Sequence, residues 1–335
     1  MDGPLWTETH APSLAELPQA EVRDHFERAL EEPMNLVVHG PAGSGKTAAV
    51  RALTREAHAN PGADRIEINV ADFFDASKKE IAEDPRFSRF IDAKRRRESS
   101  KADLINHVLK ESASYSPATG EYKTVVLDNA EAMREDFQQA LRRVMEQYYE
   151  ATQFVITTRQ PSALISPIRS RCFPIPVRSP TQNEIIDVLE GIVEAEEAPY
   201  DDDGLEYIAG ASSGDLREAI LSAQTTYEQE GEITMQTAYE TLSAVGTDER
   251  VQEMIADAEA GEFTDARSTL DELLVDEGYS GSEVLSDILD VARSRYSGDE
   301  LAEIHRLAGQ IDMDLHEGTN DRLHVSHLLA ILGKN

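Results

Sequence analysis

The stretch GPAGSGKT has the residue types and spacing of a phosphate-binding loop, G-x-x-x-x-G-K-[ST]. Glycines let backbone N–H groups converge on phosphate oxygens, and the N-terminus of a following helix adds a favourable dipole. In such a P-loop, Lys46 reaches the β- and γ-phosphates of ATP and Thr47 is a ligand for Mg²⁺. The alternative is a glycine-rich turn with an exposed lysine. The residues expected to hold the nucleotide are Gly40, Pro41, Ala42, Gly43, Ser44, Gly45, Lys46 and Thr47.

A second polar site follows an apolar segment, in the stretch KTVVLDNAEAM from Lys123 to Met133. Residues 125–127 predict a buried strand, and Asp128 lies at its exit. Asp128 is suited to hold Mg²⁺ through a water molecule; the alternative is a helix N-cap, and one residue could serve both roles. The next residue is Asn129, where an ATP-hydrolysing P-loop protein usually has an acid that handles the attacking water. An amide can hydrogen-bond water but is a very poor proton acceptor.

Short apolar strands alternate with helical patterns over the first half of the chain. This alternation predicts an α/β domain with a parallel five-stranded sheet. The predicted strands are 35–40, 65–70, 123–127, 153–158 and 172–177, and the predicted helices are 45–58, 102–114 and 134–149.

Beyond residue 178 the strand pattern stops and only helices are predicted, over 181–197, 203–211 and 216–229, with five more between about 245 and 332. The sequence thus predicts three domains. They are a nucleotide-binding domain at 1–178 with an insertion at 73–99, a small helical domain at 179–244, and an all-α domain at 245–335.

Composition narrows the class of protein further. The net charge is −32, from 64 acidic and 32 basic residues, and the apolar periodicity argues against a disordered acidic chain. We expect a folded protein from a high-salt cytoplasm, where a Debye length of roughly 3 Å at 1 M salt screens self-repulsion. The single cysteine excludes a disulfide framework and fits a reducing compartment. No apolar run has the length of a membrane span, and the N-terminus does not have the pattern of a signal peptide.

Four stretches together resemble the clamp-loader group of AAA+ proteins, in particular the small subunits of archaeal replication factor C. They are LWTETHAP at 5–12, QQALRRVME at 138–146, ISPIRSRCF at 165–173 and SSGDLREAI at 212–220. The first matches the family's W-x-E-K-Y-R-P motif at Trp6, Glu8 and Pro12 but departs from it at His10 and Ala11. The resemblance covers residues 5–230 and is weak beyond them, which indicates a divergent member.

The resemblance implies roles for three residues. Arg171 is similar to an arginine finger that reaches the γ-phosphate held by a neighbouring subunit; the alternative is a surface salt bridge. Arg217 is similar to the sensor 2 residue in the first turn of a lid helix, where Asp215 and Glu218 predict a capping box; the alternative is an ordinary surface arginine. Cys172 is expected to be a packing residue.

The departures from the family fall in the hydrolytic half of the site. The family's Asp-Glu-Ala-Asp reads Asp128-Asn129-Ala130-Glu131 here, and its sensor 1 asparagine aligns with Arg159. Compensation by Glu131 is disfavoured, because on a helix it points about 200° away from residue 129. We therefore expect a subunit that binds ATP and Mg²⁺ but hydrolyses ATP weakly.

The resemblance also implies partners: sister subunits in a hetero-pentamer, a sliding clamp and primer–template DNA, with no membrane. The basic DNA-binding positions of the family helix read Asn106 and Val108. The sequence allows two partners for Arg142 and Arg143, either DNA or the next subunit. The inserted KRRR stretch is either a replacement DNA contact or a solvated helix end. The basic candidates are Lys78, Lys79, Lys94, Arg95, Arg96, Arg97 and Lys101.

Three functions stay open at this point. The first is a clamp-loader subunit, with residues 179–244 as lid and 245–335 as oligomerising collar. The second is a DNA-stimulated AAA+ motor, such as a branch-migration helicase, which a C-terminal wing-like domain would favour. The third is a scaffold that binds neither nucleotide nor DNA. The presence of the P-loop argues against this function.

Overall fold

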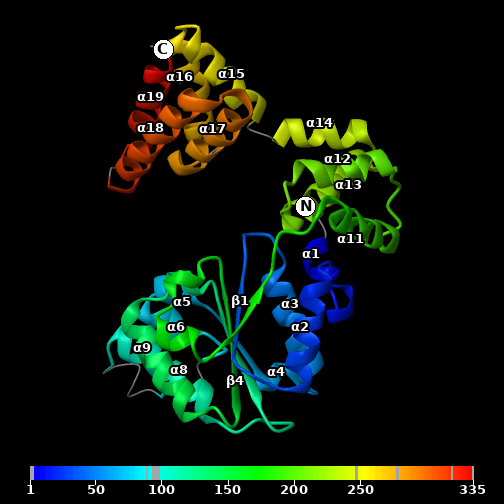
Figure 1. The fold of residues 1–335 in the computed structure, drawn as a ribbon, viewed down its shortest axis with the longest axis vertical. Coiled ribbons are helices and arrows are strands. Elements are labelled where there is room, and N and C mark those ends of the chain that lie inside the picture. The colour runs from blue at the N-terminus through cyan, green and yellow to red at the C-terminus, as the bar shows by residue number, and fades with distance from the viewer. Residues whose placement is uncertain are drawn as a thin grey trace. The chain divides into compact units, whose positions relative to one another are not determined.

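The structure is a computed structural model that describes residues 4–87, 90–92, 99–245, 248–276, 279–317 and 320–333. Its contacts divide the chain into two compact units, Met1–Ala238 and Tyr239–Asn335. The first unit holds a sheet and its covering helices, together with most of a small group of helices; the second is helical (Figure 1).

The sheet of the first unit has five parallel strands in the order β2-β3-β4-β1-β5. This confirms the predicted fold class. In parallel strands the carboxyl ends lie at one edge, and here His39 pairs with Thr158 and Asn69 with Asp128. The loops that follow β1, β3 and β4 therefore meet at that edge. The strands are β1 (Leu36–His39), β2 (Arg65–Asn69), β3 (Lys123–Asp128), β4 (Thr152–Thr158) and β5 (Phe173–Pro176).

Helices cover both faces of the sheet (Figure 1). On one face, α2 (Ala20–Glu31) and α3 (Lys46–Ala57) bury Phe26 and Leu53 in a core shared with β1 and β5. Helix α2 was not predicted from the sequence. The short elements near α2 and α3 in the sequence are α1 (Trp6–Thr9), η1 (Leu14–Glu16) and α4 (Pro61–Asp64).

The other face carries a second core that includes part of the predicted insertion. Phe73, Ile81 and Phe87 are buried with Leu104 and Phe137. The described part of 73–99 is therefore packed into the domain. The elements here are α5 (Val70–Asp75), α6 (Lys78–Glu83), α8 (Lys101–Ser114), η3 (Ala130–Ala132), α9 (Glu135–Gln147), η4 (Pro161–Ala163) and α10 (Ser166–Arg169).

A group of helices follows the sheet, and its first helix begins at a capping box. The Thr181 hydroxyl accepts a hydrogen bond from the Glu184 backbone N–H, and the Glu184 carboxylate accepts one from the Thr181 N–H. Together these satisfy backbone donors that a helix N-terminus leaves unpaired. The helices are α11 (Gln182–Ala195), α12 (Asp202–Ala211), α13 (Leu216–Glu230) and α14 (Met235–Val245), of which α14 was not predicted.

The second unit confirms the predicted helical C-terminal region and has one apolar core. In the parts of the chain that the structure describes, no helix combines the length and apolar character needed to cross a membrane. The elements of the second unit are α15 (Asp248–Glu259), α16 (Phe263–Asp271), the π-helical turn η5 (Glu272–Asp276), α17 (Gly281–Arg295), α18 (Gly298–Glu317) and α19 (Asp321–Leu332).

Candidate functional site

The P-loop connects β1 to α3, as the sequence predicted. Gly43 and Gly45 have φ values of 62° and 89°, a left-handed region that glycine enters without steric cost. Gly40 passes so close to β5 that a Cβ atom there would lie 1.8 Å from the carbonyl oxygen of Val177. The glycines are therefore required by the path of the backbone, and α3 starts directly behind them with its N-terminus toward the loop.

Thr47 and Asp128 meet at the end of the sheet. The Thr47 hydroxyl donates to the Asp128 carboxylate, at 3.0 Å to Oδ1 and 3.2 Å to Oδ2. The Thr157 hydroxyl, from β4, also donates to Asp128 Oδ1. A hydroxyl and a carboxylate are hard oxygen ligands of the kind that Mg²⁺ takes alongside nucleotide phosphates. The two residues predicted to hold Mg²⁺ are brought together and fit that ion.

Lys46 lies among charged groups at this edge. Its ammonium donates to the carbonyl of Pro41 within the loop. Burial lowers the pKa of Lys46, while the nearby carboxylates of Glu131 and Asp128 act to raise it. The lysine is thus a partly desolvated cation at the point where the loop would hold phosphate.

Asn129 occupies the exit of β3 in a left-handed conformation, with φ 55° and ψ 48°. Asparagine adopts this region more readily than most side chains. Its side-chain amide donates to Asn69 Oδ1 at 3.4 Å, and its backbone N–H donates to the Thr157 hydroxyl at 3.3 Å. The position next to Asp128 therefore carries a neutral amide, which is hydrogen-bonded to the side-chain amide of Asn69.

Glu131 and Arg159 form an ion pair that the sequence did not predict. Arg159 Nε lies 2.8 Å from Glu131 Oε1, and Oε2 accepts from the Thr158 hydroxyl at 2.9 Å and the Arg159 backbone N–H at 3.1 Å. Regular helical geometry predicted that Glu131 would point about 200° away from residue 129. The 3₁₀ turn after a left-handed Asn129 turns it toward the end of β4 instead.

Arg171 lies two residues beyond the end of α10 and is paired within its own chain. One guanidinium nitrogen lies 2.5 Å from Glu146 Oε1 and another donates to the Pro167 carbonyl at 2.6 Å. Arg142 Nε also donates to Glu146, at 3.0 Å. Cys172, which follows, is half-buried, and burial raises the pKa of its thiol to about 12.

Helix α13 brings the second predicted arginine to the P-loop. Asp215 caps this helix by accepting from the Glu218 N–H at 3.0 Å, so Arg217 lies in the first turn as predicted. The Leu216 N–H donates to the Gly43 carbonyl at 3.2 Å. A Cβ atom on Gly43 would lie 1.9 Å from the Asp215 carboxylate, so a larger residue there would displace the carboxylate that caps the helix. Arg217 is exposed next to this contact.

Two further contacts were not predicted, one at the P-loop and one at α13. Buried Gln19 donates to the carbonyls of Ser44, at 3.2 Å, and Arg178, at 2.9 Å, and so ties the loop to the segment after β5. Trp6 packs against Tyr227 of α13 with ring centroids 5.9 Å apart. The tryptophan motif gave a signal for the second contact, whereas nothing local in the sequence marks Gln19.

Of the basic DNA candidates, Lys94 to Arg97 lie outside the described residues. Lys101 donates to the Phe74 carbonyl at the start of α8. The Arg134 guanidinium lies 5.2 Å from the centre of the Phe74 ring. These groups border a cavity of about 630 Å³ between α5, η3 and α8. Among the described residues, Lys101, Arg134 and Phe74 thus form a basic and aromatic recess on this face.

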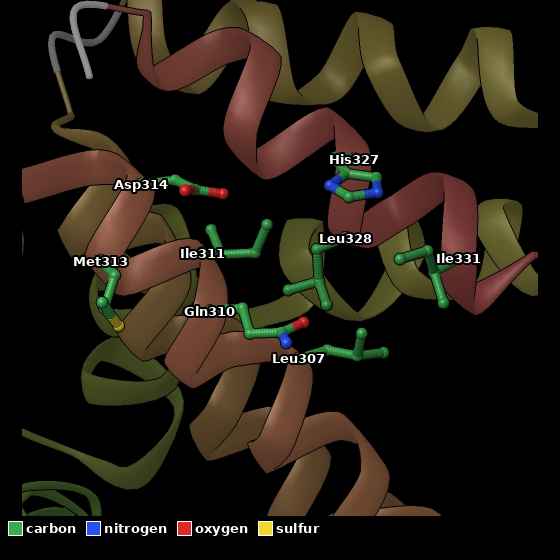
Figure 2. A pocket seen from close by; sticks show the side chains of 8 residues that line it. All are labelled: Leu307, Gln310, Ile311, Met313, Asp314, His327, Leu328 and Ile331. Carbon is green, nitrogen blue, oxygen red and sulfur yellow. The ribbon is translucent and has the colours of Figure 1, made fainter. Parts of the chain in front are cut away.

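A second cavity, of about 320 Å³, lies between α18 and α19 in the second unit (Figure 2). Five of the eight residues that line it are apolar, and the polar ones are Gln310, Asp314 and His327. None of the predicted site residues borders it.

Comparisons with known proteins agree with this arrangement. Residues 247–331 match the family described as replication factor C C-terminal domain, and residues 33–181 match the DNA polymerase III, delta subunit family. Two solved structures share the fold: a Thermotoga maritima RuvB variant and Cdc6p from Pyrobaculum aerophilum. The first has a TM-score of 0.54 and 16% identity over 80% of this chain and 90% of that chain. The second has a TM-score of 0.52 and 19% identity over 86% of each.

The fold and the P-loop site define an AAA+ protein. Replication factor C small subunits align with nearly the whole chain. That of Archaeoglobus fulgidus is 30% identical over 98% of this chain and 97% of its own length. That of Staphylothermus marinus is 31% identical over 98% and 94%, and that of Halobacterium salinarum is 28% identical over 99% and 96%. The chain belongs to the replication factor C small-subunit family.

Proposed function

We propose that this chain is a clamp-loader subunit that binds ATP with Mg²⁺, hydrolyses it weakly at its own site, and offers Arg171 to a neighbouring subunit's nucleotide. The observation that carries the proposal is the contrast within one site. Thr47, at the start of α3 behind the P-loop, meets Asp128, which supports binding of nucleotide with Mg²⁺. Asn129, in contrast, supplies an amide where hydrolysis needs a proton acceptor.

The proposal assigns partners and regions. The partners are sister AAA+ subunits in a hetero-pentamer, a sliding clamp and primer–template DNA. Residues 1–178 bind nucleotide, 179–244 act as the lid and 245–335 as the collar. Because a net charge of −32 suits a cytoplasm rich in salt, the protein is to be studied in molar KCl. In the assembled complex, sister subunits that have an acid at the water-handling position supply most of the ATP turnover.

Co-purification from a high-salt lysate tests the assembly directly. A tagged chain is expected to recover sister AAA+ subunits and the clamp, and recovery of neither overturns the proposal. The isolated chain is expected to bind ATP with Mg²⁺ and to turn it over barely above background. Vigorous DNA-stimulated turnover without partners overturns the weak-hydrolysis part.

A further inference from the structure

A buried glutamine links the P-loop to the segment that leaves the sheet. Gln19 directly precedes α2 and is 2% exposed. Its side-chain amide donates to the Ser44 carbonyl at 3.2 Å and to the Arg178 carbonyl at 2.9 Å. A primary amide has two N–H groups, so one side chain can serve both acceptors. Helix α2 is a fixed base for these contacts, because Val22 and Phe26 are buried in the core that it shares with β1 and β5.

The contact with Ser44 acts on the part of the loop that faces phosphate. The Ser44 carbonyl and the Gly45 N–H belong to one peptide unit, which is planar and trans. They therefore point in opposite directions, and a hydrogen bond that holds the carbonyl also sets the direction of the N–H. In a P-loop the backbone N–H groups converge on phosphate oxygens. Gln19 thus acts within one peptide unit of a group that is expected to bind nucleotide.

The contact with Arg178 acts on the start of the helix group. Arg178 lies in the short connection between β5 and α11. Its guanidinium lies 2.7 Å from the Glu184 carboxylate of α11 and 2.7 Å from the Glu21 carboxylate of α2. The N-terminal end of α2 therefore holds this connection twice, through the Gln19 amide at the backbone and through Glu21 at the side chain.

The helix group also reaches the P-loop directly. The Leu216 N–H, at the start of α13, donates to the Gly43 carbonyl at 3.2 Å. The neighbouring carbonyls of Gly43 and Ser44 are therefore held by α13 and by Gln19 respectively. Because α11, α12 and α13 pack on one another, the helix group has two links to the loop. One is direct, and the other runs through Gln19 and the connection before α11.

We propose that Gln19 is a positioning residue that couples phosphate binding in the P-loop to the connection at Arg178, so that bound nucleotide sets the position of the lid, residues 179–244. The inference rests on the proposed function, since it requires nucleotide in the P-loop. When the N–H groups of the loop turn toward phosphate, the Ser44 carbonyl turns with its peptide unit, and the Gln19 amide transmits this change to the Arg178 carbonyl. Without Gln19, only the contact at α13 remains.

The residue type at position 19 fits this role. Both acceptors are carbonyl oxygens and the site is buried, so the bridging group must be a neutral donor of two hydrogen bonds. A carboxylate of the same length would place oxygen against both carbonyls. A methionine side chain would fill a similar space without donating.

The test measures the position of the lid with and without ATP and Mg²⁺, on the full chain in molar KCl. Spin labels are attached at Glu27→Cys in α2 and Asp203→Cys in α12, both exposed positions, in a Cys172→Ser background. Electron–electron resonance gives the distribution of distances between the labels. Saturating ATP is expected to shift or narrow this distribution in the labelled chain. With Gln19→Met added, most of that change is expected to disappear although ATP is bound.

Gln19→Met is expected to weaken ATP binding by only about two- to tenfold, the effect of one lost hydrogen bond, so saturation stays within reach. Gln19→Glu is expected to lose the lid response as well and to weaken ATP binding more, because its carboxylate faces two carbonyl oxygens. Thermal unfolding verifies that each variant is folded. If Gln19→Met does not fold, Gln19→Asn supplies the test, since its amide is one methylene too short to serve both acceptors.

Gln153→Met is the matched control. Gln153 is also buried, at 4% exposed, and its amide donates to the Met34 carbonyl at 3.0 Å. It lies near the start of β4, at the edge of the sheet opposite the P-loop. This variant loses a buried amide without touching the loop or the connection at Arg178, so it is expected to keep the full lid response to ATP.

The remaining outcomes fall on different claims. A full lid response in Gln19→Met at saturating ATP indicates a purely local role for Gln19 and overturns the inference alone. A loss of the response in Gln153→Met equal to that in Gln19→Met also overturns it, because the effect would then follow from the loss of any buried amide. A labelled chain that binds ATP without a change in distance has no coupling for Gln19 to transmit, which overturns the inference and leaves nucleotide binding intact. Failure to bind ATP overturns the proposed function as well.

Discussion

Arg171 is held by Glu146 of the same chain, with a guanidinium nitrogen 2.5 Å from Oε1. Arg142 binds the same oxygen from the preceding turn of α9. A finger that acts on a neighbour's nucleotide must leave this contact or share it. Both side chains are substantially exposed, and exposed ion pairs of this kind contribute at most about 1 kcal/mol. The contact therefore orients Arg171 without trapping it.

Arg171→Ala is expected to lower the ATPase rate of the assembled complex more than Lys46→Ala does. Under the proposed function, loss of Lys46 disables only a site that turns over little. Loss of Arg171 would remove a transition-state cation from a neighbouring site, where such arginines contribute on the order of 10³-fold or more. Steady-state ATP hydrolysis by the reconstituted complex measures both.

Arg169→Ala is the matched control for this comparison, since Arg169 lies in the same turn and donates to the Ser166 hydroxyl. It is expected to leave the rate of the complex nearly unchanged. The opposite ranking of Arg171→Ala and Lys46→Ala would count against a finger supplied in trans.

Asn129→Glu is expected to raise ATP turnover at this subunit's own site by about tenfold or more, because a positioned carboxylate can accept a proton from water whereas an amide cannot. Asn129→Gln introduces a side chain of the same size as glutamate and bears the same cost of a left-handed backbone. Comparison of the two variants therefore isolates the effect of the carboxylate. Single-turnover hydrolysis in a complex whose other sites carry P-loop lysine substitutions measures the effect. Equal rates in the two variants would show that Asn129 does not limit hydrolysis.

The sequence predicted the strands, the P-loop and Asp128 because these depend on local patterns. Helix α2 was missed although Val22, Phe26 and Ala29 have helical spacing and are buried, so that signal was present. The ion pair of Glu131 with Arg159 is of another kind. It depends on β3 and β4 being neighbours in the sheet and on a left-handed turn at Asn129, neither of which follows from residue types alone.

Glu184→Gln is expected to destabilise the first unit by about 1 kcal/mol at neutral pH, the usual cost of a lost capping contact. Glu184 accepts from Arg178 at 2.7 Å and 2.8 Å and from the Thr181 N–H at 2.7 Å. The Arg178 contact is the main cause that lowers the pKa of Glu184 to about 2. Since the folded-state pKa lies below the unfolded value, the contribution is complete above about pH 4.5 and is lost as the pH falls toward about 2.

Denaturant unfolding at a series of pH values checks this expectation. The difference between wild type and Glu184→Gln should shrink as the pH falls through that window. Asp187→Asn, which changes an exposed carboxylate of the same helix, is the control and should show no such trend. A difference that stays constant down to about pH 2 would show that the ionised carboxylate does not contribute.

Cys172 is expected to resist alkylation in the folded protein. Burial raises the pKa of its thiol to about 12, although the charge of Arg171 acts in the other direction. Only the thiolate reacts, and an unperturbed cysteine has a pKa of about 8.5. Near pH 8 the folded chain should therefore react with iodoacetamide on the order of a thousandfold more slowly than the unfolded chain. Mass spectrometry before and after denaturation measures the ratio, and the unfolded protein is its own control because this is the chain's single cysteine. Rapid labelling of the folded protein would contradict a packing role and would mean that the thiol beside Arg171 is accessible and ionised.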